Sequence, residues 1–297
     1  MGKRGVVARN DRARARRAKQ RERRSAEVNV PKLEKSGARR QPLRMVLYSE
    51  PGWGKTTTAA YATDAALIMG RGETGYETLL GAGLVPEIPR VEVASWSEHM
   101  ALLRELAGRD ELPYKVLSLD TTGALEQLCH EHVCRRDFNG NWSQDGFLAF
   151  QKGPKTAVQD WLQMQALLDR IREKHHCSIL LLGHMDVRKS RRPLEEDFDQ
   201  AALDVEKETL GPLRRWSDCI FFGAFEANVT EDGLRKKATG EQQRVLYTQN
   251  GAAHLAKNRL GMTPVLEMSD DPSENWEIIR EEMVGRHNET DDEGVGE

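Results

Sequence analysis

The chain has 297 residues, 38% of them hydrophobic and 31% charged, with a formal net charge of −3 at pH 7. That length and apolar content suffice for one large globular domain or two small ones. No apolar run approaches the roughly 18 residues of a membrane span, and arginines fill the region where a signal peptide has its hydrophobic stretch. We therefore expect a cytoplasmic protein without membrane association.

The amino-terminal part of the chain is strongly basic. Residues 1–44 contain 16 Lys and Arg residues against 4 Asp and Glu residues, a local charge of +12 that leaves −15 for the remainder. The run RNDRARARRAKQRERR at residues 9–24 has almost no large apolar side chain, so burial of a face cannot offset the entropy cost of ordering. We expect residues 1–40 to be a basic disordered arm. Its arginine density favours binding to nucleic-acid phosphates, and a solubilising tail or a docking segment for a protein partner stays open.

A glycine-rich motif follows a short apolar run. RMVLYS at residues 44–49 is typical of a buried strand, and SEPGWGKT at residues 49–56 matches the phosphate-binding pattern G-x-x-x-x-G-K-[ST] except at its first glycine. Gly52 and Gly54 allow the backbone to approach a phosphate closely, and the following helix start directs N–H groups toward it. We predict an ATP site formed by Ser49, Glu50, Pro51, Gly52, Trp53, Gly54, Lys55, Thr56 and Thr57.

Two side chains of this motif have predicted chemical roles. Lys55 neutralises the β and γ phosphates of ATP, and the Thr56 hydroxyl helps to hold Mg²⁺. An acidic residue at the end of another strand completes such a site, and VLSLD at residues 116–120 provides Asp120. We predict that Thr56 and Asp120 hold Mg²⁺, and the alternative is an aspartate that only caps the following helix.

Short apolar runs alternate with helical patterns over the rest of the chain, which predicts an α/β fold with a mainly parallel sheet flanked by helices. Trp161, Met164, Leu168 and Ile171 recur at spacings of three and four, typical of the core face of one helix. CIFFGAFEANV and QRVLYTQ flank a charged, glycine-bearing stretch and indicate a C-terminal antiparallel hairpin. Further strands are expected at residues 65–69, 91–95, 115–120 and 177–184.

The predicted ATPase domain spans residues 41–283, and the acidic residues 284–297 are expected to form a disordered tail. Four cysteines without a CxxC pair indicate reduced thiols. LCHEHVC at residues 128–134 brings two cysteines and two histidines together. On a helix these side chains point in several directions, which argues against a zinc site.

Several motifs in their order resemble one family. YSEPGWGKTT, SWSEHMALLREL, YKVLSLDTTGALEQL, LLLGHMDV and AKNRLGMTP make residues 44–280 similar to the phage-encoded ATPases that consist of a RecA core alone and are linked to single-strand annealing and recombination. The resemblance implies a RecA-like P-loop NTPase fold and an oligomer, in the host cytoplasm if the protein is phage-encoded. Ser49 departs from the family's first glycine, and Arg71 stands where an acidic residue is common.

The resemblance also implies roles for four residues. Glu73, just beyond the second strand in ALIMGRGETG, would orient or deprotonate the attacking water, and His184 would sense the γ-phosphate. Lys257 and Arg259 would reach the nucleotide of a neighbouring subunit as cationic fingers. The alternative interpretations are an exposed loop carboxylate, a strand-end histidine and a solvated basic turn.

The polar residues 186–212 are expected to form a long loop. In RecA-like proteins the equivalent loop contacts single-stranded DNA. The acidic residues 195–199 would repel DNA phosphates, and no aromatic side chain for base stacking stands in the basic part, so a nucleotide-dependent lid or a subunit contact is the alternative. The side chains that could meet phosphates are Arg188, Lys189, Arg191 and Arg192.

The expected function is a Mg²⁺-dependent, oligomeric ATPase that acts on single-stranded DNA in phage recombination, annealing or replication. A single-strand-binding protein is a further candidate partner. Three alternatives stay open: a helicase or packaging motor on the same core, a P-loop kinase for a small molecule, and an adaptor that binds ATP with little hydrolysis.

Overall fold

The computed structural model describes residues 41–190, 197–232 and 235–292, with the backbone alone for 227–242 and 285–292. The described residues belong to one compact unit, and residues 1–40, the basic arm of the sequence analysis, lie outside them. Among the helices described, none combines the length and the apolar character needed to cross a bilayer.

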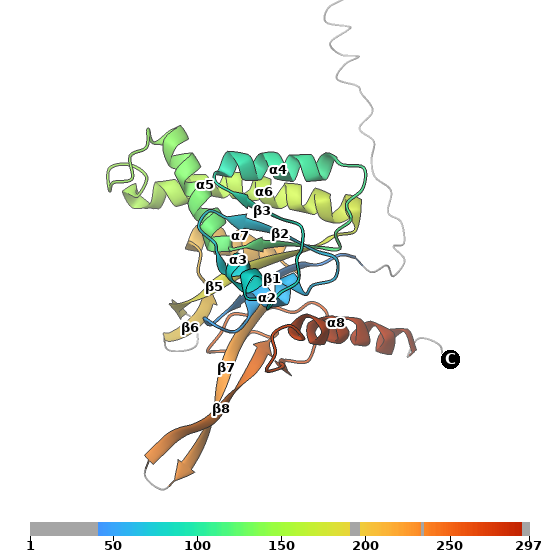
Figure 1. Ribbon diagram of the computed structural model, residues 1–297. Helices are drawn as coiled ribbons and strands as arrows, with labels where there is room; N and C mark the ends of the chain where they lie inside the picture. The colour runs from blue at the N-terminus through green and yellow to red at the C-terminus, as the bar shows by residue number, and fades with distance from the viewer. Residues whose placement is uncertain (1–40, 191–196, 233–234, 293–297) are drawn as a thin grey trace, which may run out of the picture. The chain divides into compact units, whose positions relative to one another are not determined.

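Nine strands in the described part of the chain form one sheet, in the order β3–β2–β4–β5–β1–β7–β8–β9, with β6 paired to β5 (Figure 1). The central strands are parallel, which confirms the predicted fold class. Their carboxyl ends therefore meet at one edge of the sheet. The parallel strands are β1 (Arg44–Ser49), β2 (Ala65–Gly70), β3 (Arg90–Val93), β4 (Val116–Asp120), β5 (Ser178–Ser190) and β7 (Cys219–Asp232).

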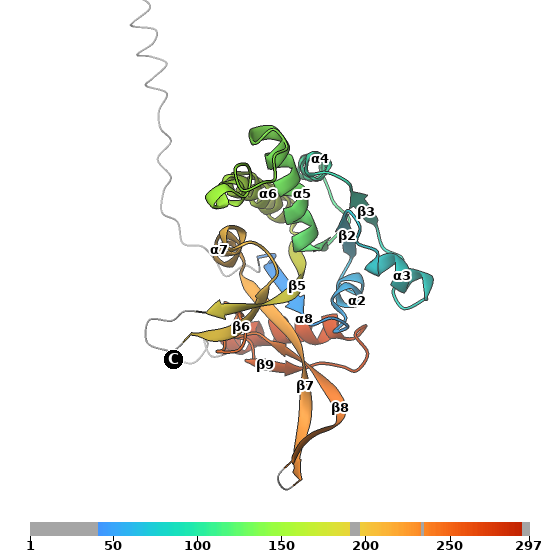
Figure 2. The ribbon, with the colours of Figure 1, turned by 90° about the vertical axis from the view of Figure 1, so that its left-hand side faces the viewer.

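Helices cover both faces of the sheet (Figures 1 and 2). Side chains alternate along β1, so that Val46 and Tyr48 pack into one apolar cluster while Met45 and Leu47 pack into another. The first cluster is covered by α4 (Trp96–Gly108), α5 (Thr122–Asp137), α6 (Lys152–His175) and α7 (Lys207–Trp216). The opposite face is covered by α2 (Lys55–Ala60), α3 (Gly75–Gly81) and α8 (Asn275–Asp292).

The predicted apolar stripe lies on α6 and is core, as expected. Its four side chains are at most 1% exposed and pack against α4, α5 and the sheet. All four cysteines are buried free thiols. Two of them, Cys129 and Cys134, pack into the same core on α5.

Strand β5 does not end at His184, which corrects the predicted strand end. Residues 185–190 continue the strand and pair in antiparallel register with β6 (Phe198–Leu203). Leu203 packs onto Gly183, where an added Cβ would lie 2.0 Å from Leu203 Cδ1. The predicted long loop is thus a hairpin followed by α7, and residues 191–196, which include Arg191 and Arg192, lie outside the described residues.

The C-terminal hairpin is confirmed, and its strands are longer than expected. Strand β7 runs to Asp232 and β8 (Arg235–Tyr247) begins three residues later, so most of the charged stretch belongs to the strands. The pair extends as a ribbon beyond the helices (Figure 1). The hairpin is not the edge of the sheet, because a short strand, β9 (Val265–Glu267), pairs with β8 and forms that edge.

Helix α8 continues past the predicted end of the domain. Trp276 and Ile279 anchor it in the core beneath α2. The helical backbone extends to Asp292, and no proline interrupts the run. The predicted tail, residues 284–297, therefore starts inside a helix.

Candidate active site

The phosphate loop joins β1 to α2 at the carboxyl edge of the sheet. Pro51 and Gly52 form its exposed tip. Gly52 and Gly54 have φ angles of 79° and 104°, a conformation that favours glycine. An added Cβ on Gly54 would also lie 2.4 Å from Pro272 Cβ. The loop runs into the start of α2, whose first N–H groups lack intrahelical acceptors, so it has the features of a phosphate cradle.

The buried Lys55 side chain reaches back to the start of the loop. Its Nζ donates to Ser49 Oγ at 3.0 Å, and the Ser49 hydroxyl donates to the carbonyl oxygen of Glu50. Burial lowers the pKa of Lys55, and the carboxylates of Asp120 and Glu73 oppose that shift. Ser49, which departs from the motif's first glycine, thus supplies a hydrogen-bond acceptor that holds the lysine over the loop.

Strands β7 and β8 hold the loop from the side. The Glu50 N–H donates to Gly223 O at 3.1 Å, and Trp53 Nε1 donates to Val245 O at 3.1 Å. Arg244 Nε donates to Trp53 O at 3.1 Å. Because the Trp53 side chain is fully buried, it belongs to the core, and only its backbone is placed to meet a phosphate.

The magnesium-binding pair predicted from the sequence lies together. Thr56 Oγ1 donates to Asp120 Oδ2 at 2.9 Å, between the first turn of α2 and the end of β4. Burial raises the pKa of Asp120 to about 6, the negative charge of Glu73 adds to this, and the Thr56 hydrogen bond and Lys55 oppose it. Thr57 is buried one residue further along α2.

Glu73 lies at the same edge. Its N–H donates to Gly70 O at 3.1 Å in the turn after β2, and its Oε1 accepts a hydrogen bond of 2.6 Å from Thr121 Oγ1. Thr121 directly follows Asp120, so both carboxylates are held by one short segment. The sequence did not assign a role to Thr121, and its position after Asp120 was the signal that could have found it.

His184 lies on the strand beside the phosphate loop. It is in register with Ser49 across the β1–β5 pair, and its carbonyl oxygen accepts from the Asp204 N–H. The residue is exposed. The register places the His184 backbone beside the loop's first residue, and the sensor role stays a prediction.

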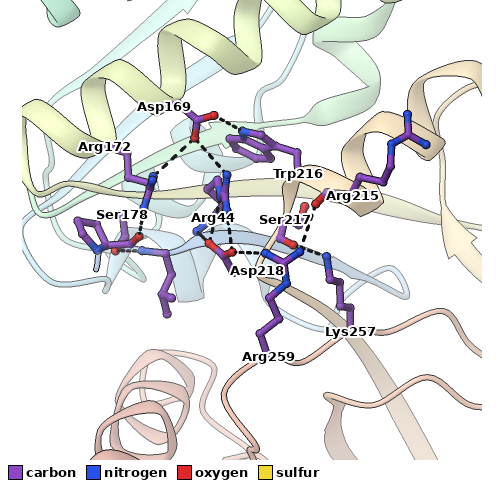
Figure 3. Close-up of polar contacts among 12 residues, drawn as sticks. Arg44, Asp169, Arg172, Ser178, Arg215, Trp216, Ser217, Asp218, Lys257 and Arg259 are labelled. Atoms are coloured by element: carbon purple, nitrogen blue, oxygen red, sulfur yellow. Dashed lines mark hydrogen bonds and ion pairs between the residues drawn. The ribbon is translucent and has the colours of Figure 1, made fainter. Parts of the chain in front are cut away.

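Lys257 and Arg259 lie instead at the amino edge of the sheet (Figure 3). Lys257 Nζ donates to Arg214 O at 2.7 Å and to Ser217 O at 2.5 Å, at the end of α7. Arg259 Nη1 contacts Asp218 Oδ1 at 2.8 Å. Within the chain both cations therefore hold the end of α7 and the start of β7.

The same cluster contains the first residue of β1. Arg44 donates from Nη2 to Asp218 Oδ1 at 2.9 Å, and Nη1 lies 3.5 Å from Asp169 Oδ1 (Figure 3). Ser49 lies five residues after Arg44 along β1, a distance of roughly 16 Å. The cluster and the phosphate loop thus lie at opposite edges of the sheet.

Comparison with known proteins identifies one family and a similar solved structure. Residues 41–260 match the family described as AAA domain. No curated protein sequence matches the chain. Among solved structures, the crystal structure of the RadB recombinase is similar, with 12% sequence identity and a TM-score of 0.45 over 78% of this chain and 90% of that chain. The family match includes the phosphate loop, Glu73 and Asp120, and the chain belongs to the AAA domain family of P-loop NTPases.

Proposed function

We propose that the protein is a Mg²⁺-dependent ATPase that acts on single-stranded DNA as an oligomer, in phage recombination, annealing or replication. One observation carries the enzymatic part: Lys55, Thr56, Asp120 and Glu73, from three separate segments, converge at the carboxyl edge of the sheet. Ligands bind at this edge in open α/β folds.

Each side chain has a distinct task in hydrolysis. The loop's N–H groups and Lys55 bind the phosphates, and the ammonium stabilises negative charge that develops on them. Glu73 orients the attacking water and accepts its proton. Because Glu73 Oε1 is held by Thr121, the second carboxylate oxygen is the one directed to that water.

The residues present fit a magnesium ion. Thr56 and Asp120 offer a hydroxyl and a carboxylate oxygen 2.9 Å apart, the hard oxygen ligands that Mg²⁺ prefers. The raised pKa of the buried Asp120 shows a carboxylate that an added cation would stabilise. When bound, the ion would neutralise charge on the β and γ phosphates.

The DNA part rests on charge. The +12 balance of residues 1–44 supports a polyanion as partner. The β5–β6 hairpin offers less positive charge to DNA, because Arg188 Nε already pairs with Asp186 Oδ2 at 3.0 Å within the chain. We therefore assign most of the salt-dependent affinity for DNA to the arm.

The oligomer is supported by the position of the two predicted fingers. Lys257 and Arg259 lie at the edge opposite the phosphate loop of their own subunit, so only a neighbouring subunit's ATP could meet them. Mixing Lys55→Ala with Arg259→Gln tests this. Mixed oligomers should recover hydrolysis that neither variant shows, because some interfaces then combine an intact loop with an intact finger. Absence of recovery would contradict the subunit-bridging role.

The function is tested by phosphate release from ATP with and without single-stranded DNA, at two salt concentrations. Wild type is compared with Lys55→Ala and with a truncated variant lacking residues 1–40. We expect stimulation by DNA, loss of activity in Lys55→Ala, and loss of the salt-sensitive stimulation in the truncated variant. Hydrolysis indifferent to DNA in every variant would overturn the DNA part and favour a phosphate acceptor of another kind.

A further inference from the structure

Helix α5 holds the turn that carries Glu73. The turn follows β2 and spans residues 70–73, and it contacts α5 at three points. Gly70 lies against Ala124, where an added Cβ would be 2.6 Å from the Ala124 Cβ atom. Arg71 Nη2 contacts Glu131 Oε1 at 2.5 Å, and Thr121 Oγ1 donates to Glu73 Oε1 at 2.6 Å.

In the third contact, the group that holds the turn is itself fixed: it is the hydroxyl of Thr121. Thr121 is the N-cap residue of α5, and its Oγ1 accepts a hydrogen bond from the Ala124 N–H. Its side chain is buried, with a relative exposure of 3%. The hydroxyl is thus fixed by the helix start on one side and bonded to the carboxylate on the other, so the cap leaves Glu73 little freedom.

The residue before Thr121 connects the same segment to the phosphate-loop helix. Asp120, one residue before Thr121, accepts from Thr56 on the first turn of α2. The segment of Asp120 and Thr121 therefore ties the phosphate-loop helix to the Glu73 turn through two successive side chains. The hydrogen bond from Thr121 fixes one oxygen of the Glu73 carboxylate, so the gain for catalysis lies in orientation.

We propose that Thr121 is a positioning residue for ATP hydrolysis, which holds the Glu73 carboxylate in the orientation that meets the attacking water. The proposal rests on the function proposed above. Thr121 itself contacts neither nucleotide nor water in this role, and acts through Glu73 alone.

Single-turnover ATP hydrolysis of wild type, Thr121→Val, Thr121→Ser and Glu73→Gln tests this, together with the affinity for a fluorescent ATP analogue. We expect Thr121→Val to reduce the rate constant roughly 10- to 100-fold. Nucleotide affinity should stay within about threefold, since the phosphate loop is untouched. Thr121→Ser keeps the hydroxyl and should restore the rate to within about threefold of wild type.

Thr122→Val is the matched control. Thr122 is also buried and β-branched, but its hydroxyl donates to Leu182 O on β5 and not to Glu73. Its loss should lower the melting temperature with little change in the rate constant. If Thr121→Val does not fold, Thr121→Ala removes the same hydroxyl with a smaller side chain.

The double variant separates positioning from general damage. In the Glu73→Gln background, Thr121→Val should have no further effect, because the group on which it acts is already inactive. Equal rates for wild type and Thr121→Val, or equal losses in both backgrounds, would overturn the inference. If wild type does not hydrolyse ATP, or Glu73→Gln is as fast as wild type, the proposed catalytic role of Glu73 fails first and the inference with it.

Discussion

The two edges of the sheet both gather charged side chains and use them in opposite ways. At the amino edge, Arg44 and Arg259 converge on Asp218, so the charges are paired within the chain (Figure 3). At the carboxyl edge, the carboxylates of Asp120 and Glu73 lie close enough to influence each other's charge. The nearby Lys55 ammonium offsets part of their negative charge, but its hydrogen bond goes to the uncharged Ser49 hydroxyl. Charge satisfied internally stabilises a fold, whereas charge left without a full partner is suited to a ligand.

Asp218 and Asp120 show this difference most directly. Burial raises the pKa of both, but at Asp218 the hydrogen bonds from Arg44 outweigh burial and the pKa lies below its usual range. At Asp120 the Thr56 hydrogen bond does not outweigh burial, and the pKa rises to about 6. The same residue type thus stabilises one edge and carries the chemistry of the other.

The largest effect is expected from Glu73→Gln at the carboxyl edge. Replacing the base should lower the rate constant of hydrolysis at least 10²-fold, since a positioned base contributes roughly 10²–10⁴ in rate. ATP affinity should change less than about threefold, because Glu73 is not part of the phosphate loop. Single-turnover kinetics and equilibrium binding measure the two quantities. Wild-type rates in this variant would remove Glu73 from the mechanism.

The next largest effect is expected on stability, from Asp218→Ala at the amino edge. Asp218→Ala leaves Arg44 and Arg259 without their common partner and should lower the free energy of unfolding by about 3 kcal/mol. Urea denaturation at pH 7 measures this. Because the pKa of Asp218 is lowered on folding, its stabilisation is present above the unfolded value near 4 and is lost as pH falls through the folded pKa. A variant as stable as wild type would contradict the structural role of the Asp218 contacts.

Asp120→Asn should raise the free energy of unfolding, whereas Asp218→Ala lowers it. Folding raises the pKa of Asp120, so ionisation destabilises the folded protein increasingly from about pH 4 to about pH 6 and fully above that range. In EDTA and without nucleotide, the variant should be more stable than wild type by about 1–3 kcal/mol at pH 8, and equal to it near pH 3. Urea denaturation at the two pH values provides the check. Destabilisation at pH 8 would mean that Asp120 is already fully compensated within the chain.

The smallest effect is expected from Arg259→Gln on stability. The Arg259 side chain is 50% exposed, and solvent screens its ion pair with Asp218. Removing it should lower the free energy of unfolding by roughly 0.5 kcal/mol. Arg44, which is 21% exposed and bonded to the same aspartate, serves as the comparison, and Arg44→Gln should cost more. Equal losses would mean that burial does not distinguish the two pairs.

The sequence predicted the carboxyl edge better than the amino edge, for a physical reason. Lys55, Thr56 and Asp120 belong to local motifs with fixed spacing, and the structure brings them together. The Arg44–Asp218 pair joins residues 174 positions apart, and no local pattern indicates such a contact. Likewise, the extension of β5 beyond His184 depends on pairing with β6, which the polar composition of that segment concealed.

The measurement that tests the account most directly is the equilibrium affinity for a fluorescent ATP analogue of wild type, Lys55→Met and Arg44→Met, with Mg²⁺ at saturation. Each substitution removes one positive charge from a side chain that is mostly shielded from solvent, Lys55 at the carboxyl edge of the sheet and Arg44 at the amino edge. We predict that Lys55→Met weakens binding at least tenfold, through loss of its phosphate contact, while Arg44→Met binds within about twofold of wild type. Equal affinities for all three proteins, or a loss confined to Arg44→Met, would contradict the assignment of the nucleotide site to the carboxyl edge.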